Sequence, residues 1–158
     1  WRKRKYYLSS SAKKGSGGIV FDLSHEFDFI SWIFGRDMKL INYVKKKNSL
    51  LKIQTEDYLS LNAKIKNRIY ININLNYYSQ ITNRKIFVEG DKLSIECDLI
   101  NNFLLYKFKN KTKKYKFKNF HRNDTFLNMH KNILTNNNKE LCNYFDGLKL
   151  MNFIDQIK

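Results

Sequence analysis

The sequence predicts an α+β fold, in which helices pack on one face of an open, mostly antiparallel β-sheet. Three observations favour this class. In residues 17–35 the apolar residues recur at steps of three and four, the spacing of one side of an α-helix. From residue 38 to residue 118 apolar and polar residues mostly alternate, which is typical of strands with one buried face. Two stretches with helical spacing, 124–134 and 139–157, then close the chain.

The first 16 residues, WRKRKYYLSSSAKKGS, are basic and aromatic and show no regular apolar spacing. They predict an N-terminal arm or loop that leads into the first helix. The chain begins with Trp1 rather than methionine, so we expect further residues before it in a parent protein.

The helix predicted over residues 17–35 opens at a glycine pair and ends at Gly35, the usual place of a helix C-cap. One stripe of it should face the core, namely Val20, Leu23, Phe27, Ile30 and Phe34. Beside this stripe Asp22, His25 and Asp28 are spaced three residues apart and should form a short polar row. The row is the feature of the sequence that could support chemistry. It could equally be structural, with Asp28 in a buried polar pair and Asp22 favoured by the helix dipole.

Strands are predicted where the alternation is clearest: 38–45, 58–66, 69–77, 85–89, 92–98 and a hairpin within 103–120. In residues 69–77 the isoleucines share one face with Leu75, and Asn72, Asn74 and Asn76 share the other. This asparagine face should meet either water or a ligand.

The hairpin is expected to turn near residues 110–113, with aromatic residues on one side and lysines on the other. The aromatic side would hold Tyr106, Phe108, Tyr115 and Phe117, and the lysine side Lys107, Lys109, Lys114, Lys116 and Lys118. Such lysines protect an edge strand from pairing with other chains, which is the interpretation we favour. The alternative is a surface that binds polyanions such as nucleic acid.

The closing helix should bury Leu141, Phe145, Leu148, Phe153 and Ile157. If helices cover one face of the sheet, the other face needs a partner, so we expect a homo-oligomer formed through the sheet face.

Composition limits the remaining possibilities. The 158 residues suffice for one domain, and no run of about 18 apolar residues suggests a membrane span. The net charge of +16 invites a nucleic-acid role, but the basic residues are 24 Lys and only 6 Arg, and base recognition favours Arg. Cys97 and Cys142 lack the spacing of a metal site or disulfide framework, so both should be small buried residues of a soluble, cytoplasmic protein.

Four stretches resemble the C-terminal domain of the Gfo/Idh/MocA oxidoreductases. GGIVFDLSHEFDFISWIFG (17–35) is similar to the family's glycine pair followed by Asp, His and Asp, in the branch with the pattern Ser-His-Glu. SSSAKK (9–14) resembles its Tyr-Ser-Ala-Arg-Lys segment, and KIFVEGDKLSIECDL (85–99) its strand, glycine turn and strand. HRNDTFLNMHKNIL with CNYFDGLKLMNFIDQI is similar to its closing pair of helices.

The resemblance implies a two-domain enzyme whose other half is a Rossmann domain that binds NAD or NADP. This chain would be the half that binds substrate and forms the oligomer, acting on a sugar or sugar derivative. No cofactor site is expected in the chain itself, because Gly15, Gly17 and Gly18 follow no strand and lack the dinucleotide spacing. No metal site is expected either, because the two cysteines lack metal-site spacing.

The resemblance also implies roles for three residues. His25 would transfer the hydroxyl proton. Asp22 would orient either the His25 imidazole or the substrate, and Lys13 could bind an anionic group of the substrate. Many members of the family place Asp and His four residues apart, whereas Asp22 and His25 are three apart. Two other functions stay open, a stand-alone polyanion-binding module and a relative that keeps the fold for oligomerisation without catalysis.

Overall fold

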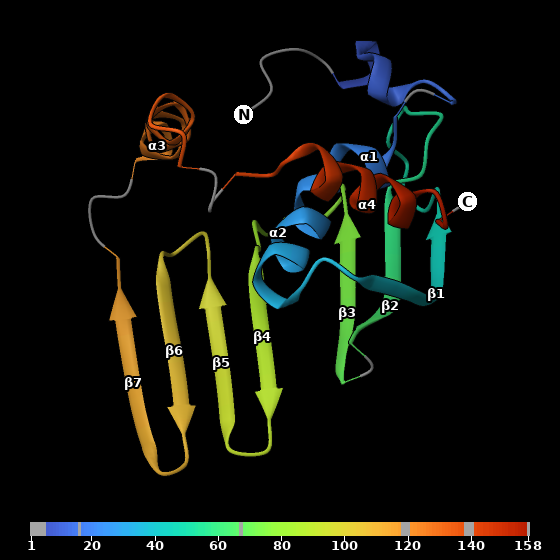
Figure 1. Ribbon diagram of the computed structural model, residues 1–158. Coiled ribbons are helices and arrows are strands. Elements are labelled where there is room, and N and C mark those ends of the chain that lie inside the picture. The colour runs from blue at the N-terminus through green and yellow to red at the C-terminus, as the bar shows by residue number, and fades with distance from the viewer. Residues whose placement is uncertain (1–5, 16, 67, 118–120, 138–140, 158) are drawn as a thin grey trace. The chain divides into compact units, whose positions relative to one another are not determined.

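The structure is a computed structural model that describes residues 6–15, 17–66, 68–117, 121–137 and 141–157 (Figure 1). By its internal contacts the chain divides into two compact units, Trp1–Ser79 with Cys142–Lys158, and Gln80–Leu141. The described residues form both helices and strands, with turns and loops between them, and every strand pairing is antiparallel. The α+β class is therefore confirmed, while the expectation of one domain over residues 1–158 stays a prediction.

The first unit is a sheet of order β1-β2-β3 with helices on one face (Figure 1). Its strands are β1 (Met38–Lys46), β2 (Tyr58–Ile65) and β3 (Ile69–Asn76), and its helices are α1 (Ile19–Asp22), α2 (Ser24–Phe34) and α4 (Tyr144–Ile154). Two short 3-10 turns, η1 (Tyr6–Leu8) and η2 (Ser10–Ala12), precede them, where the sequence had indicated an irregular arm.

The core of this unit lies between the helices and the inward face of β2. Leu59, Leu61, Ala63 and Ile65 are fully buried there because they occupy every second position of the central strand. Phe27 of α2 meets Phe153 of α4 edge to face, with ring centroids 5.9 Å apart. Helices on one face of the sheet are thus confirmed for this unit.

The predicted apolar stripe of residues 17–35 is also confirmed, since Val20 and Phe27 are buried and Leu23, Ile30 and Phe34 pack against the core. The prediction of one continuous helix was wrong at Leu23. There the backbone turns to φ −107° and ψ 22°, which ends α1 and begins α2. Gly35 is the C-cap of α2, as expected.

The last helix begins later than predicted. Asn143 is its N-cap and accepts a hydrogen bond from the Asp146 amide, so α4 covers 144–154 rather than 139–157. Phe153 and Ile157 are buried as expected, but Phe145 is 71% exposed and Leu148 43%. The helix presents its face with Leu150, Phe153 and Ile154 to the core instead.

The second unit is a sheet of order β4-β5-β6-β7, followed by the helix α3 (Arg122–Leu134). The strands are β4 (Lys85–Gly90), β5 (Leu93–Asp98), β6 (Phe103–Phe108) and β7 (Lys111–Lys116). β3 and β4 share no ladder because alternation stops in the intervening stretch YYSQITNR, so the described strands form two sheets rather than the single sheet expected.

The β6–β7 hairpin turns at residues 109–110, at the beginning of the predicted range of 110–113. Its register pairs Leu104 with Tyr115 and Tyr106 with Lys113. Tyr106 and Tyr115 therefore share a face, with stacked rings 6.1 Å apart, as the alternation indicated. Lys111 and Lys113 lie on this aromatic face, while Lys107, Lys114 and Lys116 lie on the other; Lys118 is outside the described residues.

None of the helices in the described part of the chain combines the length and apolar character needed to cross a membrane.

Candidate functional site

The segment before α1 is docked on the residues that lead into β2. The backbone amide of Gln54 donates to the carbonyl of Ala12 at 2.8 Å, and that of Gly18 donates to the carbonyl of Ser11 at 3.1 Å. The amide of Ile19 in turn donates to the carbonyl of Glu56 at 3.2 Å. These bonds hold the start of α1 against the central strand, which positions the polar residues that follow.

Both glycines of the pair are required by this docking. A Cβ on Gly17 would lie 2.3 Å from the Cα of Ser11, so the two backbones touch only because Gly17 has no side chain. Gly18 has φ +102°, and its Cβ would lie 2.6 Å from a carboxylate oxygen of Glu56. Gly17 therefore serves close backbone packing, and Gly18 serves a backbone conformation that other residues rarely adopt.

The same geometry shows whether these glycines could form a phosphate-binding loop. A dinucleotide turn joins a strand to a helix whose N-terminus faces the pyrophosphate. Here the glycines follow a 3-10 turn and precede the short helix α1, and the Glu56 carboxylate occupies the space beside Gly18. A carboxylate repels phosphate, so these residues do not fit the pyrophosphate of NAD or NADP.

We predict that Gly17→Ala destabilises the first unit by about 1–3 kcal/mol, because the added methyl overlaps backbone atoms that no rotamer change can move. Urea denaturation measures the effect. Gly147→Ala is the matched control, since its methyl meets nothing within 4 Å and lies inside α4. That control should be stabilising by up to about 1 kcal/mol, and an equal effect of both substitutions would contradict the packing argument.

His25 lies in the first turn of α2 with its side chain 59% exposed. Its Nε2 atom is 3.3 Å from a carboxylate oxygen of Glu26, whose own side chain is 19% exposed. An accessible imidazole with a carboxylate beside it can take or give a proton and keep the resulting charge stabilised. Asp22 is half-buried at the end of α1. The break at Leu23 means that Asp22 and His25 do not share one helix.

Glu26 is a residue that the sequence analysis missed. It was passed over because adjacent residues point to different sides of a regular helix. Glu26 could have been identified from the sequence, because it directly follows His25 in the Ser-His-Glu pattern.

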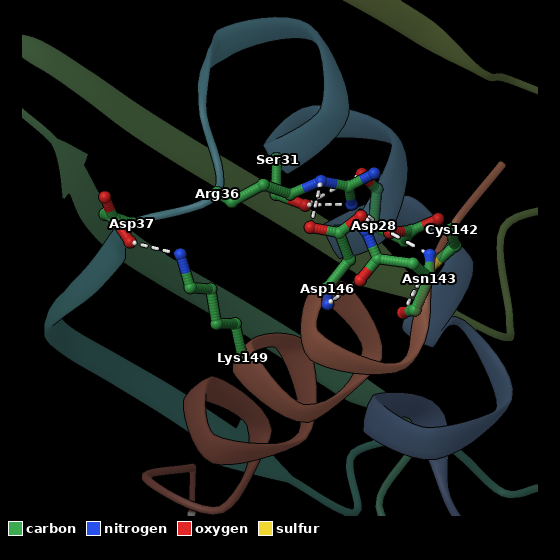
Figure 2. A network of polar contacts seen from close by, with 8 residues as sticks. All are labelled: Asp28, Ser31, Arg36, Asp37, Cys142, Asn143, Asp146 and Lys149. Carbon is green, nitrogen blue, oxygen red and sulfur yellow. Dashed lines mark hydrogen bonds and ion pairs between the residues drawn. The ribbon is translucent and has the colours of Figure 1, made fainter. Parts of the chain in front are cut away.

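Asp28 belongs to a polar network that joins α2 to α4 (Figure 2). Its carboxylate accepts from Arg36 Nη1 at 2.5 Å, and Arg36 also bonds the buried Ser31 hydroxyl at 3.2 Å. Arg36 Nε lies 3.5 Å from the carboxylate of Asp146 in α4. This supports the structural interpretation of Asp28, with Arg36 rather than His25 as its partner.

Cys142 lies beside this network and is exposed, so the prediction that it is buried was wrong (Figure 2). It immediately precedes Asn143, the N-cap of α4, and therefore lies outside the helix. The residue as a whole is exposed, but its sulfur is partly withdrawn from water, and this partial burial, together with the nearby Asp28 carboxylate, raises the pKa of the Cys142 thiol, which disfavours a reactive thiolate. Cys97 is half-buried and also a free thiol.

In the described ranges no three His, Cys, Asp or Glu side chains come together as a metal site would require.

Lys13 lines a hollow of about 480 Å³ between the docked segment and the residues before β2. The lining consists of Tyr7, Ala12, Lys13, Lys52, Ile53 and Gln54. Two ammonium groups on one hollow favour an anionic ligand. Lys52 is a second residue that the sequence analysis missed, since it lies 39 positions from Lys13 and only the docking brings them together.

The lysines of the β6–β7 hairpin are all exposed within the described residues. Lys114 lies over the ring of Phe103 and Lys109 over that of Phe108, so two of them cover aromatic surface. β7 is the last strand in the order of its sheet, and its lysines are placed where edge protection requires them.

Comparison with known proteins gives the family. The profile of the oxidoreductase family, C-terminal alpha/beta domain (Gfo/Idh/MocA), matches residues 1–156. No curated protein sequence matched the chain.

Several solved structures share the fold. An oxidoreductase from Agrobacterium radiobacter, in complex with NAD+, L-tartaric acid and magnesium, superposes with a TM-score of 0.78 at 16% identity, covering 96% of this chain and 49% of that one. For a UDP-N-acetylglucosamine 3-dehydrogenase from Acidithiobacillus ferrooxidans the TM-score is 0.73 at 10% identity, covering 98% and 48%. A 3-ketoreductase from Actinomadura kijaniata, in complex with NADP and TDP-benzene, gives 0.66 at 8%, covering 92% and 46%.

At these identities the superpositions establish the fold alone, and this chain spans about half the length of each of those proteins. The profile match, by contrast, extends over nearly every residue of the chain. The chain belongs to the Gfo/Idh/MocA oxidoreductase family, whose C-terminal alpha/beta domain it represents.

Proposed function

We propose that this chain is the substrate-binding and oligomerisation half of an NAD(P)-dependent oxidoreductase acting on a sugar or sugar derivative. The observation that carries the proposal is the exposed His25 imidazole at the start of α2, with the Glu26 carboxylate 3.3 Å away, in a chain of an oxidoreductase family. Two of the similar structures, a UDP-N-acetylglucosamine 3-dehydrogenase and a 3-ketoreductase, are named for chemistry at a sugar carbon or a ketone, which supports this substrate class.

In this proposal the nicotinamide cofactor is bound by a companion domain of the parent protein and supplies or accepts the hydride. The residues of this chain handle the proton. When an alcohol is oxidised its hydroxyl must lose a proton as hydride leaves the carbon, so a base within hydrogen-bond reach is needed. His25 takes that proton, and Glu26 stabilises the imidazolium that forms. Asp22 at the end of α1 would position the substrate hydroxyl.

Lys13 and Lys52 would bind an anionic group of the substrate, such as a carboxylate or phosphate, in the hollow that both line. We predict that Lys13→Met raises KM by about 10- to 100-fold with kcat little changed, because a charge-assisted hydrogen bond of about 1.5–3 kcal/mol is lost from ground state and transition state alike. Steady-state kinetics of the parent protein measure this. The matched control is Lys14→Met, an equally exposed lysine outside the hollow. Equal increases of KM for both variants would count against a site at Lys13.

Oligomerisation is proposed through the sheet of the second unit. One face of that sheet combines Ile86, Val88, Leu93, Ile95, Leu104 and Tyr106, none of them buried within the chain. A contiguous apolar face of this kind suits a second copy of the chain. A cytoplasmic location belongs to the same proposal.

The experiment that tests the function uses the complete parent protein. Its turnover is followed by the absorbance of the reduced nicotinamide, with NAD and NADP in turn, on neutral, amino and acidic sugars in free and nucleotide-linked form. Turnover of at least one is expected, and this chain alone should be inactive. Salt-dependent binding to nucleic acid without any turnover, weakened by Lys→Gln changes in the β6–β7 hairpin, would favour the polyanion-binding alternative.

A further inference from the structure

The outward face of β1–β3 holds a hydrogen-bonded row of asparagine side chains, which we call the amide row: Asn42, Asn62, Asn72 and Asn74. Asn62 pairs directly with Asn42 on one side and Asn72 on the other, so three amides cross the sheet in line. The Asn62 amide donates to Asn42 at 2.9 Å, the Asn72 amide donates to Asn62 at 2.9 Å, and Asn74 donates to Asn72. In each link of the row the side-chain nitrogen of one asparagine donates to the side-chain oxygen of the next.

Each amide of the row keeps hydrogen-bonding capacity. A primary amide has two N–H donors and an oxygen with two lone pairs, and the row uses one donor and one lone pair of each central member. Asn62 and Asn72 therefore present a donor and an acceptor side by side to whatever lies above the sheet. Adjacent hydroxyl groups of a sugar ring, which both donate and accept, match this pattern.

A hollow of about 320 Å³ lies on the amide row and is lined by Ile41, Asn42, Asn62, Ala63, Tyr70, Ile71 and Asn72. A β-bulge between Leu40 and Asn42 makes Ile41 an extra residue on β1. Bulges turn side chains away from the regular pleat and are frequent beside binding sites. The volume falls at the small end of ligand sites, the size of one or two sugar rings.

Tyr70 bounds the hollow on β3 and is 76% exposed. It lies two residues from Asn72, hence on the same face of the strand. An exposed aromatic ring beside a polar row offers an apolar surface and a hydroxyl together, which suits the C–H face of a pyranose.

Two lysines extend this face next to the hollow. Lys64 lies directly opposite Lys39 on one neighbouring strand and opposite Tyr70 on the other. Like charges placed directly opposite each other destabilise a sheet unless an anion lies between them. No carboxylate pairs with Lys39 or Lys64 among the described residues.

We propose that this hollow binds a sugar acid, a pyranose with a carboxylate of the hexuronate type. The amide row meets its hydroxyl groups, Tyr70 packs on its ring face, and the ammonium groups of Lys64 and Lys39 meet its carboxylate. The site is separate from His25 and requires neither the cofactor nor turnover, so it stands independently of the proposed function. The competing occupant is a second copy of this chain. Interfaces between identical subunits have apolar cores, whereas the middle of this face is a row of primary amides.

The test is titration of the full chain, labelled with ¹⁵N-asparagine, with glucuronate and separately with glucose. We expect glucuronate to shift the side-chain amide resonances of Asn62 and Asn72 and to bind about 5-fold more tightly than glucose, the preference an exposed ion pair allows. Tyr70→Ala should weaken glucuronate binding by about 3- to 10-fold without unfolding the chain, because this side chain is largely exposed.

Lys64→Gln should remove the preference for glucuronate over glucose. Lys46→Gln should leave it intact, because Lys46 lies at the far end of β1 and pairs with Tyr58, whereas Lys64 pairs with Tyr70, which lines the hollow. The proposal is overturned if neither sugar moves the Asn62 and Asn72 resonances, if Tyr70→Ala binds as tightly as the original chain, or if both lysine changes act alike. It is also overturned if these resonances move with protein concentration instead of sugar, since a second copy would then cover the face.

Discussion

Replacing His25 by alanine in the complete parent protein is expected to lower kcat by about 10²- to 10⁴-fold, the range typical of a lost general base. The imidazole is 59% exposed and contacts Glu26, so its removal takes away the proton acceptor without opening the core. KM should change little if the histidine acts mainly in the transition state. Steady-state kinetics with saturating cofactor give both constants.

Two controls separate catalysis from structure. His130→Ala, an exposed histidine of α3, should leave kcat unchanged. Glu26→Gln should reduce kcat less than His25→Ala does, because it removes only the stabilisation of the imidazolium. A His25→Ala enzyme with the original kcat would refute the proposed role and favour a relative that keeps the fold for oligomerisation alone.

Replacing Asp57 by alanine is expected to cost about 3 kcal/mol of unfolding free energy, a large share of the stability of a small domain. Asp57 is fully buried immediately before β2. Its carboxylate accepts from the backbone amides of Asn48 and Ser49 at 2.6 Å and 3.2 Å and pairs with the Lys47 ammonium at 3.0 Å. Alanine leaves these donors without an acceptor and releases the loop that joins β1 to β2.

Urea denaturation of the chain measures the loss as a lower midpoint with an unchanged slope. The matched control is Asp37→Ala, which removes an equally charged residue from an exposed pair with Lys149. An exposed pair contributes about 0–1 kcal/mol. A loss at Asp57 no greater than that at Asp37 would contradict the argument.

The same carboxylate predicts a dependence on pH. Burial by itself raises the pKa of Asp57, but the hydrogen bonds from Ser49, Asn48 and Lys47 outweigh it and leave the pKa below the ordinary value of 3.8. The carboxylate therefore stabilises the fold fully above that value, and the stabilisation is lost as pH falls from there through the lowered pKa. Acid titration of stability should show this loss in the original chain and a smaller one in Asp57→Asn.

Much of the fold could be predicted from local sequence. The strands of the first unit begin and end within one residue of the predicted positions, because β-branched and aromatic residues alternate there with polar ones. The stripe that includes Val20 and Phe27 was recognised from its spacing, and Gly35 from its place after the last apolar residue. Family membership was evident from the glycine pair and the Ser-His-Glu pattern, which are also local.

The surroundings of the candidate site residues could be predicted only in part. His25 and Lys13 were identified as candidates, but their neighbours Glu26 and Lys52 were not. The partner of Asp28 was not identified, since Arg36 follows the end of α2 and returns to the carboxylate from outside the helix. The break at Leu23 and the exposure of Cys142 were likewise beyond helical periodicity.

The sequence by itself therefore determined the strands, the buried stripe and the family, because each depends on residues a few positions apart. The tertiary structure decided the rest: that the glycine pair packs on Ser11 and Glu56, that Lys13 meets Lys52 across a hollow, and that asparagines of different strands form the amide row. The reason is physical. A hydrogen bond or a close backbone contact depends on distance in space, and the chain places residues far apart in sequence at that distance only when the whole sheet and its covering helices have formed.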